Sequence, residues 1–238
     1  MSNQINLATT ALPREVQAIR RSIARALKTP DPSRPTQTIG QAKAGIYAFY
    51  DYDGEPIYVG QTAEGFSVRI GRHLTGQRSD AVAKYVLDPF EVHTISMWSL
   101  PHIGDLPEKQ RKAALNPFEY TVYQQLLETS TYRAILNEGD IPVGLLQQLP
   151  ESVTEVIIPN EIFPDRNHPD IRIARRAQTI SLLAKNISER KVSMGLRRTL
   201  ATQTARLNAL ARARFEALGD IVEEEGPEGA VDEPEPLF

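Results

Sequence analysis

Apolar and aromatic residues gather in short runs that predict β-strands. Residues 44–50 (AGIYAFY) and 55–60 (EPIYVG) are rich in the side chains that pleated sheets favour. Residues 51–54 (DYDG) between them supply turn chemistry, so the two runs predict a β-hairpin. Residues 90–100 (FEVHTISMWSL) are β-branched and aromatic and predict a third strand, whereas residues 153–158 predict only a small one.

Apolar residues that recur every three or four positions predict helices on both sides of these strands. The predicted helices span residues 12–28, 66–74, 79–87, 107–115, 117–128, 170–187 and 191–218. The segment at 117–128 is either a separate helix or a bent continuation of the one before it. Three prolines in residues 29–38 predict a linker, and Gly219 predicts the end of the last helix.

Four side chains with chemical potential are expected to converge on one patch. Tyr47 and Tyr58 lie on the two neighbouring strands of the predicted hairpin. Arg69 and His73 are four residues apart on the following helix and therefore share one of its faces. Two phenols, a guanidinium and an imidazole are thus predicted to lie together.

On these residues the chain resembles the GIY-YIG nuclease superfamily. The GIY signature is intact at residues 45–47, and the second signature is present as YVG at residues 58–60. Arg69 and His73 follow in the family's order, and so do a helix-borne Glu119 and Asn137, so the resemblance covers about residues 43 to 138. Among the members, this chain is most similar to the restriction endonucleases.

The resemblance implies an α/β (α+β) fold, namely a small antiparallel three-stranded sheet flanked by helices, with a helical C-terminal extension. The expected divisions are an N-terminal helix and linker, a nuclease core, a connecting segment with a basic helical extension, and an acidic disordered tail. These divisions correspond to residues 1–38, 39–140, 141–218 and 219–238.

The resemblance also implies roles in Mg²⁺-dependent (or Mn²⁺-dependent) phosphodiester hydrolysis. Tyr47 would lie near the attacking water, Arg69 on the phosphate and Glu119 on the metal, with Tyr58, His73 and Asn137 completing the site. A guanidinium matches phosphate geometry, and a hard cation on a carboxylate stabilises the developing charge. A tyrosine has a pKa near ~10, so the sequence leaves open whether Tyr47 or His73 takes the proton from water.

Each of these residues also has a purely structural interpretation. The tyrosines could be ordinary strand aromatics, and Arg69 with His73 a solvated helix face. Glu119 could close a capping box that begins at Asn116, and Asn137 could be a turn residue. Glu64 lies in the loop after the second signature, and its charge would oppose phosphate binding, so we expect it to point away.

The net charge of −3 conceals a strong asymmetry along the chain. Residues 166–214 hold twelve Lys or Arg and two Asp or Glu, a local balance of +10, whereas residues 216–238 hold nine acids and no base. Such a basic segment favours contact with nucleic-acid phosphates, and a solvated helical hairpin is the alternative. The predicted DNA-binding residues are Arg72, Arg78, Arg172, Arg175, Arg176, Arg197, Arg198 and Arg206.

Composition narrows the remaining choices. The chain has no cysteine, which excludes disulfides and thiolate metal sites, and it has no apolar run long enough to span a membrane. We therefore expect a cytoplasmic protein with no membrane partner. The resemblance implies that it is an enzyme acting on duplex DNA, and a homodimer is one arrangement for cutting both strands. The alternatives are a homing or repair nuclease, a non-catalytic DNA-binding module on the same fold, and an RNA-cleaving toxin.

Overall fold

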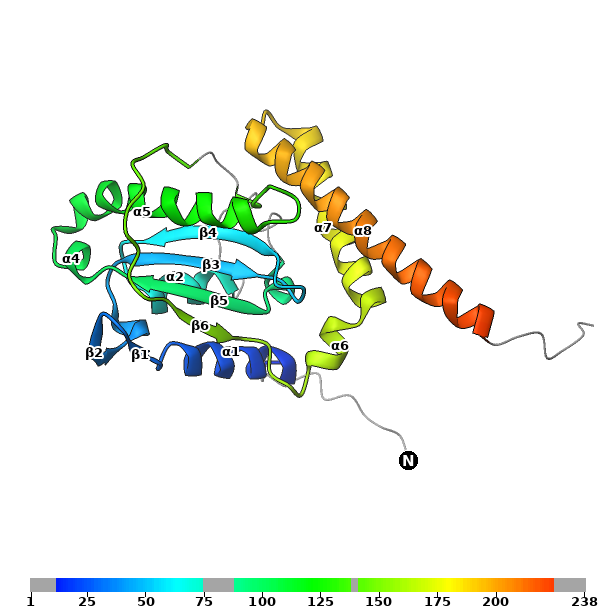
Figure 1. The fold of residues 1–238 in the computed structure, drawn as a ribbon, viewed down its shortest axis with the longest axis horizontal. Coiled ribbons are helices and arrows are strands. Elements are labelled where there is room, and N and C mark those ends of the chain that lie inside the picture. The colour runs from blue at the N-terminus through cyan, green and yellow to red at the C-terminus, as the bar shows by residue number, and fades with distance from the viewer. Residues whose placement is uncertain (1–11, 75–87, 138–140, 225–238) are drawn as a thin grey trace, which may run out of the picture.

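Four antiparallel strands in the order β4-β3-β5-β6 form the central sheet (Figure 1). Their bounds are Gly45–Tyr50 for β3, Pro56–Thr62 for β4, Thr94–Ser99 for β5 and Val153–Val156 for β6. The expectation of three strands is therefore wrong by one. The short β6 pairs with β5, from which it is far removed in sequence, and a local pattern does not indicate such a partner. This computed structural model describes residues 12–74, 88–137 and 141–224, without the side chains of His73 and residues 220–224.

The strand register defines the two ends of the sheet. Gly45 at the start of β3 pairs with Thr62 of β4 and Ser99 of β5, and these three residues mark one end. The hairpin turn at residues 51–55 marks the other end. Side chains near either end come from segments that are far apart in the chain.

Helices cover both faces of the sheet. Helix α5 (Glu108–Thr129) packs over β3 and β4, where Leu115 and Val122 contact the apolar side chains of one face. The other face packs against helix α1 (Arg14–Ala26) and helix α2 (Phe66–Leu74), which keeps the predicted bounds. The edge strand β4 therefore lies between helices that belong to two different layers.

Helix α5 runs without a break through Pro117. The hydroxyl of Thr121 donates to the carbonyl of Pro117 (2.7 Å) within this stretch. Because Asn116 lies inside the helix, it caps nothing, and the capping-box interpretation of Glu119 is wrong.

The predicted linker at residues 29–38 is instead a small hairpin. Strand β1 (Pro30–Asp31) pairs with β2 (Arg34–Thr38), and the buried Asp31 accepts a hydrogen bond from the backbone of Ser33 to close the turn. The 3-10 turn η1 (Ile39–Gln41) follows. The proline-containing segment therefore forms an ordered hairpin and not a flexible linker.

The predicted strand at 90–100 begins late. Asp88 accepts a hydrogen bond from the backbone N–H of Phe90 and starts the 3-10 turn η2 (Pro89–Glu91), so extended pairing begins only at Thr94. The short helix α4 (Pro101–Gly104) follows β5 directly.

The C-terminal part is helical, as expected. Helix α6 (Phe163–Asn167) leads into α7 (Pro169–Glu189), which begins at its proline, and α7 packs against the long α8 (Met194–Glu224). The prediction that Gly219 ends the last helix is wrong, because α8 continues through it. The predicted helix at 79–87 and the tail beyond residue 224 lie outside the described residues. Over the described ranges, no helix has the length and apolar character to cross a membrane.

Candidate active site

The two signature glycines are where the sheet requires them. Tyr47 pairs with Gly60, and a Cβ at Gly60 would lie 2.5 Å from the Tyr47 hydroxyl. A Cβ at Gly45 would lie 2.3 Å from the backbone oxygen of Trp98 and 2.4 Å from the ring of Phe66. Any side chain at either position would collide, so both glycines let aromatic rings lie directly against the strands.

Tyr47 is fully buried and lies in a small aromatic cluster. Its ring centroid is 6.1 Å from that of Tyr58 and 5.3 Å from that of Phe49. Burial raises the pKa of Tyr47 well above 10, the neighbouring Tyr58 raises it further, and Arg69 opposes the shift. The phenol therefore holds its proton, and its oxygen serves the site as a hydrogen-bonding group.

Arg69 connects this cluster to the surface. Its Nε donates to the hydroxyl of Tyr47 (3.2 Å), and the side chain lines a cavity of about 280 Å³. The cavity is also lined by Gln61, Thr62, Ala63, Glu64, Glu108 and Lys112. It spans the edge strand β4, with α2 supplying Arg69 and α5 supplying Glu108 and Lys112, so two layers meet at a single opening.

Glu64 and Arg72 differ from expectation. Glu64 lines the cavity instead of pointing away from it, and its carboxylate forms an ion pair with Arg72. The pairing neutralises the charge that would repel a phosphate, and it engages Arg72, which was predicted to contact DNA. His73 lies in α2 as predicted, with its side chain outside the described part of the structure, and Arg78 lies wholly outside it.

Glu119 is the buried carboxylate of the site. Its Oε2 accepts a hydrogen bond from Gln61 Nε2 (2.8 Å), which also donates to Asn116 Oδ1 (2.8 Å). Burial raises the pKa of Glu119 above 4.5, while Gln61, Arg69 and Lys112 oppose the shift. Within the described part of the chain, the hydrogen-bond donors to this buried carboxylate are neutral amides, which leaves its charge incompletely compensated and able to bind a ligand.

The donor set suits a hard cation. Gln61 Oε1 is buried and has no hydrogen-bond partner among the described residues, and it belongs to the side chain that contacts Glu119. Mg²⁺ binds through one or two carboxylates and retains several waters, so a carboxylate beside an amide oxygen is compatible with it. No group of three or more His, Cys, Asp or Glu metal ligands occurs within the described ranges.

Sequence reasoning did not identify Gln61 and Asn116 as partners of Glu119. Val59 and Gln61 lie two residues apart on β4, so their side chains leave the same face of the strand. Since Val59 packs in the core beneath α5, that alternation was the signal available in the sequence.

Asn137 supports the strand rather than the cavity. Its Nδ2 donates to the carbonyl of Val59 (2.8 Å), and its Oδ1 accepts from the N–H of the same residue (3.2 Å). The backbone N–H of Leu136 also donates to Ile57 (3.0 Å), so this segment pairs with the outer edge of β4. Asn137 is therefore a positioning residue in this structure.

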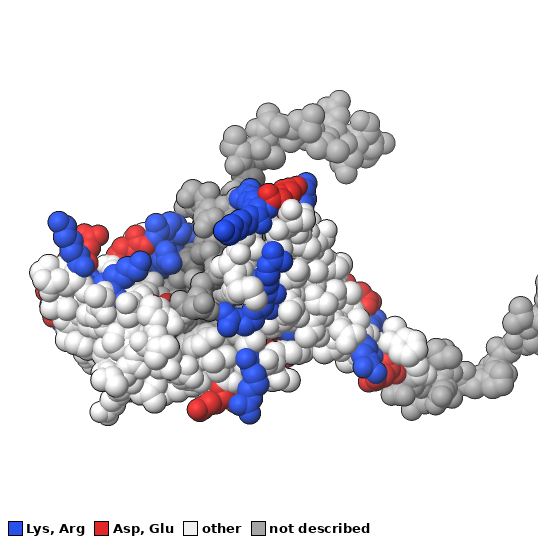
Figure 2. All heavy atoms as spheres, turned by 90° about the horizontal axis from the view of Figure 1, so that it is seen from above, with Lys and Arg blue, Asp and Glu red and all other residues white. Residues whose placement is uncertain are grey.

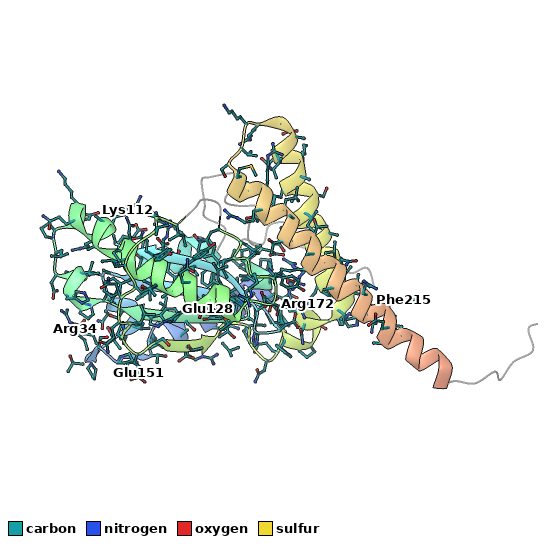
Figure 3. All side chains as sticks on the ribbon, turned by 45° about the horizontal axis from the view of Figure 1, so that its top comes forward. Arg34, Lys112, Glu128, Glu151, Arg172 and Phe215 are labelled. Atoms are coloured by element: carbon teal, nitrogen blue, oxygen red, sulfur yellow. The ribbon has the colours of Figure 1, made fainter. Side chains whose placement is uncertain are left out.

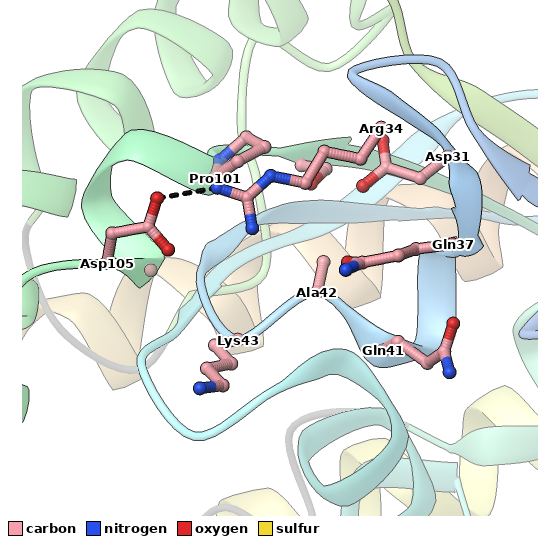
Figure 4. A pocket seen from close by; sticks show the side chains of 10 residues that line it. Asp31, Arg34, Gln37, Gln41, Ala42, Lys43, Pro101 and Asp105 are labelled. Atoms are coloured by element: carbon pink, nitrogen blue, oxygen red, sulfur yellow. Dashed lines mark hydrogen bonds and ion pairs between the residues drawn. The ribbon is translucent and has the colours of Figure 1, made fainter.

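A second polar hollow, of about 190 Å³, lies at the same end of the sheet (Figure 4). The β1–β2 hairpin and α4 line it, and an ion pair between Arg34 and Asp105 (2.5 Å) spans it.

Three arginines predicted to contact DNA are buried instead. Arg172, Arg176 and Arg206 are 3–4% exposed, and all three guanidinium groups surround the carboxylate of Asp51. Their further partners are Asp53 and Glu91. Figure 3 shows Arg172 where α7 meets the core. The prediction that these three arginines contact DNA is wrong, because a phosphate has no access to them.

Arg175 has a similar role at the margin of this group. It forms two hydrogen bonds to Asp88 (2.7 and 2.8 Å), and its guanidinium lies over the ring of Phe90. Asp51 in turn accepts hydrogen bonds from the backbone N–H groups of Asp53 and Glu55, which fixes the β3–β4 turn. We name Asp51, Asp53, Glu91, Arg172, Arg176 and Arg206 the arginine clasp, which holds the α7–α8 hairpin on the core.

Exposed cations lie elsewhere on this hairpin. At least six of the twelve Lys and Arg of residues 166–214 form ion pairs with carboxylates of the described residues, so the local balance of +10 overstates the surface charge. Five of the other six, all exposed, surround the turn between α7 and α8, namely Lys185, Arg190, Lys191, Arg197 and Arg198. We call these five the hairpin tip. Figure 2 shows cations there and at the start of α5.

Comparisons with known proteins add no assignment. No family model, no curated protein and no solved structure matches the chain.

Proposed function

We propose that this protein is a Mg²⁺-dependent endonuclease that hydrolyses phosphodiester bonds in duplex DNA. The observation that carries the proposal is the open cavity at one end of the sheet, which Arg69 and Gln61 line while they form hydrogen bonds with the buried Tyr47 and Glu119 behind it. The order and spacing of the GIY and YVG signatures support the same function.

In this proposal Arg69 binds the phosphate that undergoes cleavage. Its Nε is occupied by the Tyr47 hydroxyl, which fixes the orientation of the guanidinium while the side chain faces the cavity. A planar guanidinium held in this way offers its remaining N–H groups to phosphate oxygens in one geometry. Lys112 adds positive charge on the opposite wall of the cavity.

Glu119 and the amide oxygen of Gln61 would hold the metal ion. When bound, Mg²⁺ supplies charge neutralisation on the phosphoryl oxygens and stabilises the leaving oxygen. Because burial keeps the proton on Tyr47, the phenol acts by positioning Arg69, and His73 becomes the stronger candidate to accept the proton of the attacking water.

The hairpin tip is the proposed DNA-holding surface in place of the buried arginines. It is connected to the site, because Thr199 near the start of α8 donates to the carbonyl of Asn137 (3.3 Å), and Asn137 holds β4. Exposed cations on a rigidly docked hairpin can contact the phosphate backbone on either side of the cleaved bond.

The proposal is tested by incubating purified protein with supercoiled plasmid, linear duplex, single-stranded DNA and RNA, each with Mg²⁺ or EDTA. We expect nicking or linearisation of duplex DNA with Mg²⁺ and none with EDTA. Cleavage of RNA alone would instead support a ribonuclease. Binding to duplex without cleavage of any substrate would support a non-catalytic DNA-binding module.

A further inference from the structure

The polar hollow shown in Figure 4 adjoins the candidate active site. Residues 41–43 line it, just before β3 begins. The carbonyl of Ala42 accepts a hydrogen bond from the N–H of Phe66 (3.4 Å), and the hydroxyl of Ser67 donates to the carbonyl of Gly40 (2.8 Å). The loop that precedes Phe66 lines the active-site cavity. One short stretch of chain therefore separates the hollow from the cavity.

The strand register gives the distance between the two openings. Gly45 of β3 pairs with Thr62 of β4 on one side and with Ser99 of β5 on the other. Thr62 lines the active-site cavity, and Ser99 lines the hollow. Neighbouring strands lie about 4.8 Å apart, so the backbones of Thr62 and Ser99 are about 10 Å apart. A DNA strand advances about 3.4 Å per base pair, so a duplex with its cleaved phosphate in the cavity has base pairs within about three steps of that phosphate at the hollow.

The charge of the hollow suits base edges better than phosphates. Arg34 and Lys43 are its cations, Asp31 and Asp105 are its carboxylates, and Arg34 pairs with Asp105 (2.5 Å). Phosphates bind through net positive charge, which the five cations of the hairpin tip supply and this balanced lining does not. A base edge carries hydrogen-bond donors and acceptors without a net charge, so it matches a lining that offers both.

The lining does not suit an apolar partner. Ala42 and Pro101 are the apolar side chains among the described residues that form it. The buried core of a protein–protein interface is instead rich in large apolar and aromatic side chains. A polar ligand is therefore favoured here.

Gln37 offers a side-chain amide for base contact. It lies on β2, it is exposed, and Figure 4 shows its amide reaching toward Ala42 in the hollow. Its side chain has no hydrogen-bond partner within the described ranges. The amide of Gln41, in contrast, accepts a hydrogen bond from the N–H of Thr38 (2.8 Å). A free glutamine amide can bond adenine N6 and N7 together, and both atoms face the major groove.

We propose that the β1–β2 hairpin reads base edges in the major groove beside the cleaved phosphate, with Gln37 contacting an adenine. The major groove admits a two-stranded β-ribbon, which is the form of this hairpin. Arg34, held by Asp105, presents its remaining N–H groups to a neighbouring base. The hairpin tip then positions the duplex and the β1–β2 hairpin supplies sequence specificity. Because it requires binding to duplex DNA, this assignment rests on the proposed function.

Selection of bound sequences from a random duplex library, with the full chain in EDTA, tests the proposal. We expect the wild-type protein to enrich a sequence that contains an adenine, and Gln37→Ala to lose the preference at that adenine. Fluorescence anisotropy should show that Gln37→Ala binds the enriched duplex about 5- to 150-fold more weakly, the effect of one lost bidentate contact. Binding to an unrelated duplex should not change, which also shows that the variant is folded. Gln178→Ala removes an exposed amide from α7 and should match the wild-type protein.

An adenine analogue locates the contact. Replacing the adenine by 7-deazaadenine, which has carbon in place of N7, should weaken wild-type binding. Gln37→Ala should bind the normal and the modified duplex equally. An unaltered sequence preference in Gln37→Ala, or equal sensitivity of both proteins to the analogue, would overturn the assignment. A wild-type protein that enriches no sequence would overturn it as well.

Binding in EDTA involves no cleavage, so the base contact and the nuclease activity fail separately. Sequence-specific binding that depends on Gln37, without cleavage in Mg²⁺, would contradict the nuclease activity and leave the base contact standing. Cleavage in Mg²⁺ with a sequence preference that Gln37→Ala leaves unchanged would overturn the base contact alone.

Discussion

Charged side chains have different kinds of partner at the two ends of the β3–β4 hairpin. At the turn, Asp51 is surrounded by three buried arginines, and the arginine clasp pairs each cation with a carboxylate. At the other end, Glu119 and Arg69 are held by neutral partners, an amide and a phenol. Figure 3 shows these regions apart, with Arg172 at one and Lys112 near the other.

The difference indicates that the arginine clasp has a structural role, whereas the Glu119–Arg69 end can bind a ligand. Opposite charges that neutralise one another leave nothing for a ligand, and they fix the geometry of the elements that carry them. A buried charge held by a neutral group remains partly uncompensated, which costs stability and leaves a binding capacity. Substitutions at the clasp should therefore lower stability, whereas substitutions at the Glu119–Arg69 end should impair activity.

The largest expected effect is on stability, at the clasp. Asp51→Asn removes the carboxylate that three arginines share, and burial already lowers the pKa of Arg206, so its charge is poorly solvated there. Breaking a buried pair in this way costs about 3–5 kcal/mol. Urea denaturation should show this loss. Asp53→Asn is the control, and it should cost under about 1 kcal/mol because its side chain is 58% exposed.

If Asp51→Asn unfolds at the same urea concentration as the wild-type protein, the clasp does not stabilise the docking of α7 and α8. The hairpin would then be held by apolar contacts alone.

The next effect concerns catalysis at the site end. Arg69→Lys keeps the charge, but one ammonium cannot donate to Tyr47 and also present a fork to phosphate. We expect the cleavage rate to fall by about 100-fold, the effect of losing a positioned donor, while unfolding is little changed. Single-turnover cleavage assays measure the rate. Wild-type turnover in Arg69→Lys would mean that only the charge of Arg69 matters.

A smaller effect tests the cost of the uncompensated carboxylate. The pKa of Glu119 is raised in the folded protein, so its ionised form destabilises the fold once the pH exceeds the ordinary value of 4.5. Glu119→Gln should therefore be more stable than the wild-type protein at neutral pH. This gain should shrink as the pH falls toward 4.5. Thermal melts across that range measure it, and a constant difference would contradict the account.

The smallest effect concerns the hairpin tip. Replacing Lys191 and Arg197 by Gln should weaken binding to every duplex sequence alike, since phosphate contacts carry no sequence information. The slope of log K against log[salt] should fall by about 2, because each phosphate that the protein no longer neutralises lowers it by about 0.9. Fluorescence anisotropy over a salt series measures both. Arg214→Gln is the control because Arg214 pairs with Asp170, and an equal change in that variant would assign the effect to net charge.

The site could be predicted from sequence where its signals are local. Tyr47 and Tyr58 lie on adjacent strands joined by a recognisable turn, and the helix at 66–74 has its apolar period intact. Strand alternation places Gln61 on the same face as Val59, but its contact with Glu119 could not be predicted, because Gln61 reaches Glu119 only once α5 packs on β4.

The arginines were misassigned for the same physical reason. A count of charges along residues 166–214 does not show that Arg176 and Arg206 meet Asp51, which lies far away in the sequence. The small strand predicted at residues 153–158 is present as β6, but its place as the fourth strand of the sheet was not predicted, since β6 gains its partner only after the intervening chain has folded. Local patterns predicted the elements, and long-range pairing decided their roles.

The most direct test of the central claim compares duplex cleavage by Glu119→Gln and Glu108→Gln. Glu108 is an exposed carboxylate that lines the cavity, whereas Glu119 is buried behind Gln61, and the two variants lose equal charge. If Glu119 holds the metal, Glu119→Gln should lose about a thousandfold in Mg²⁺-dependent cleavage rate, whereas Glu108→Gln should stay within a few-fold of the wild-type protein. Equal rates for the two variants would contradict the account.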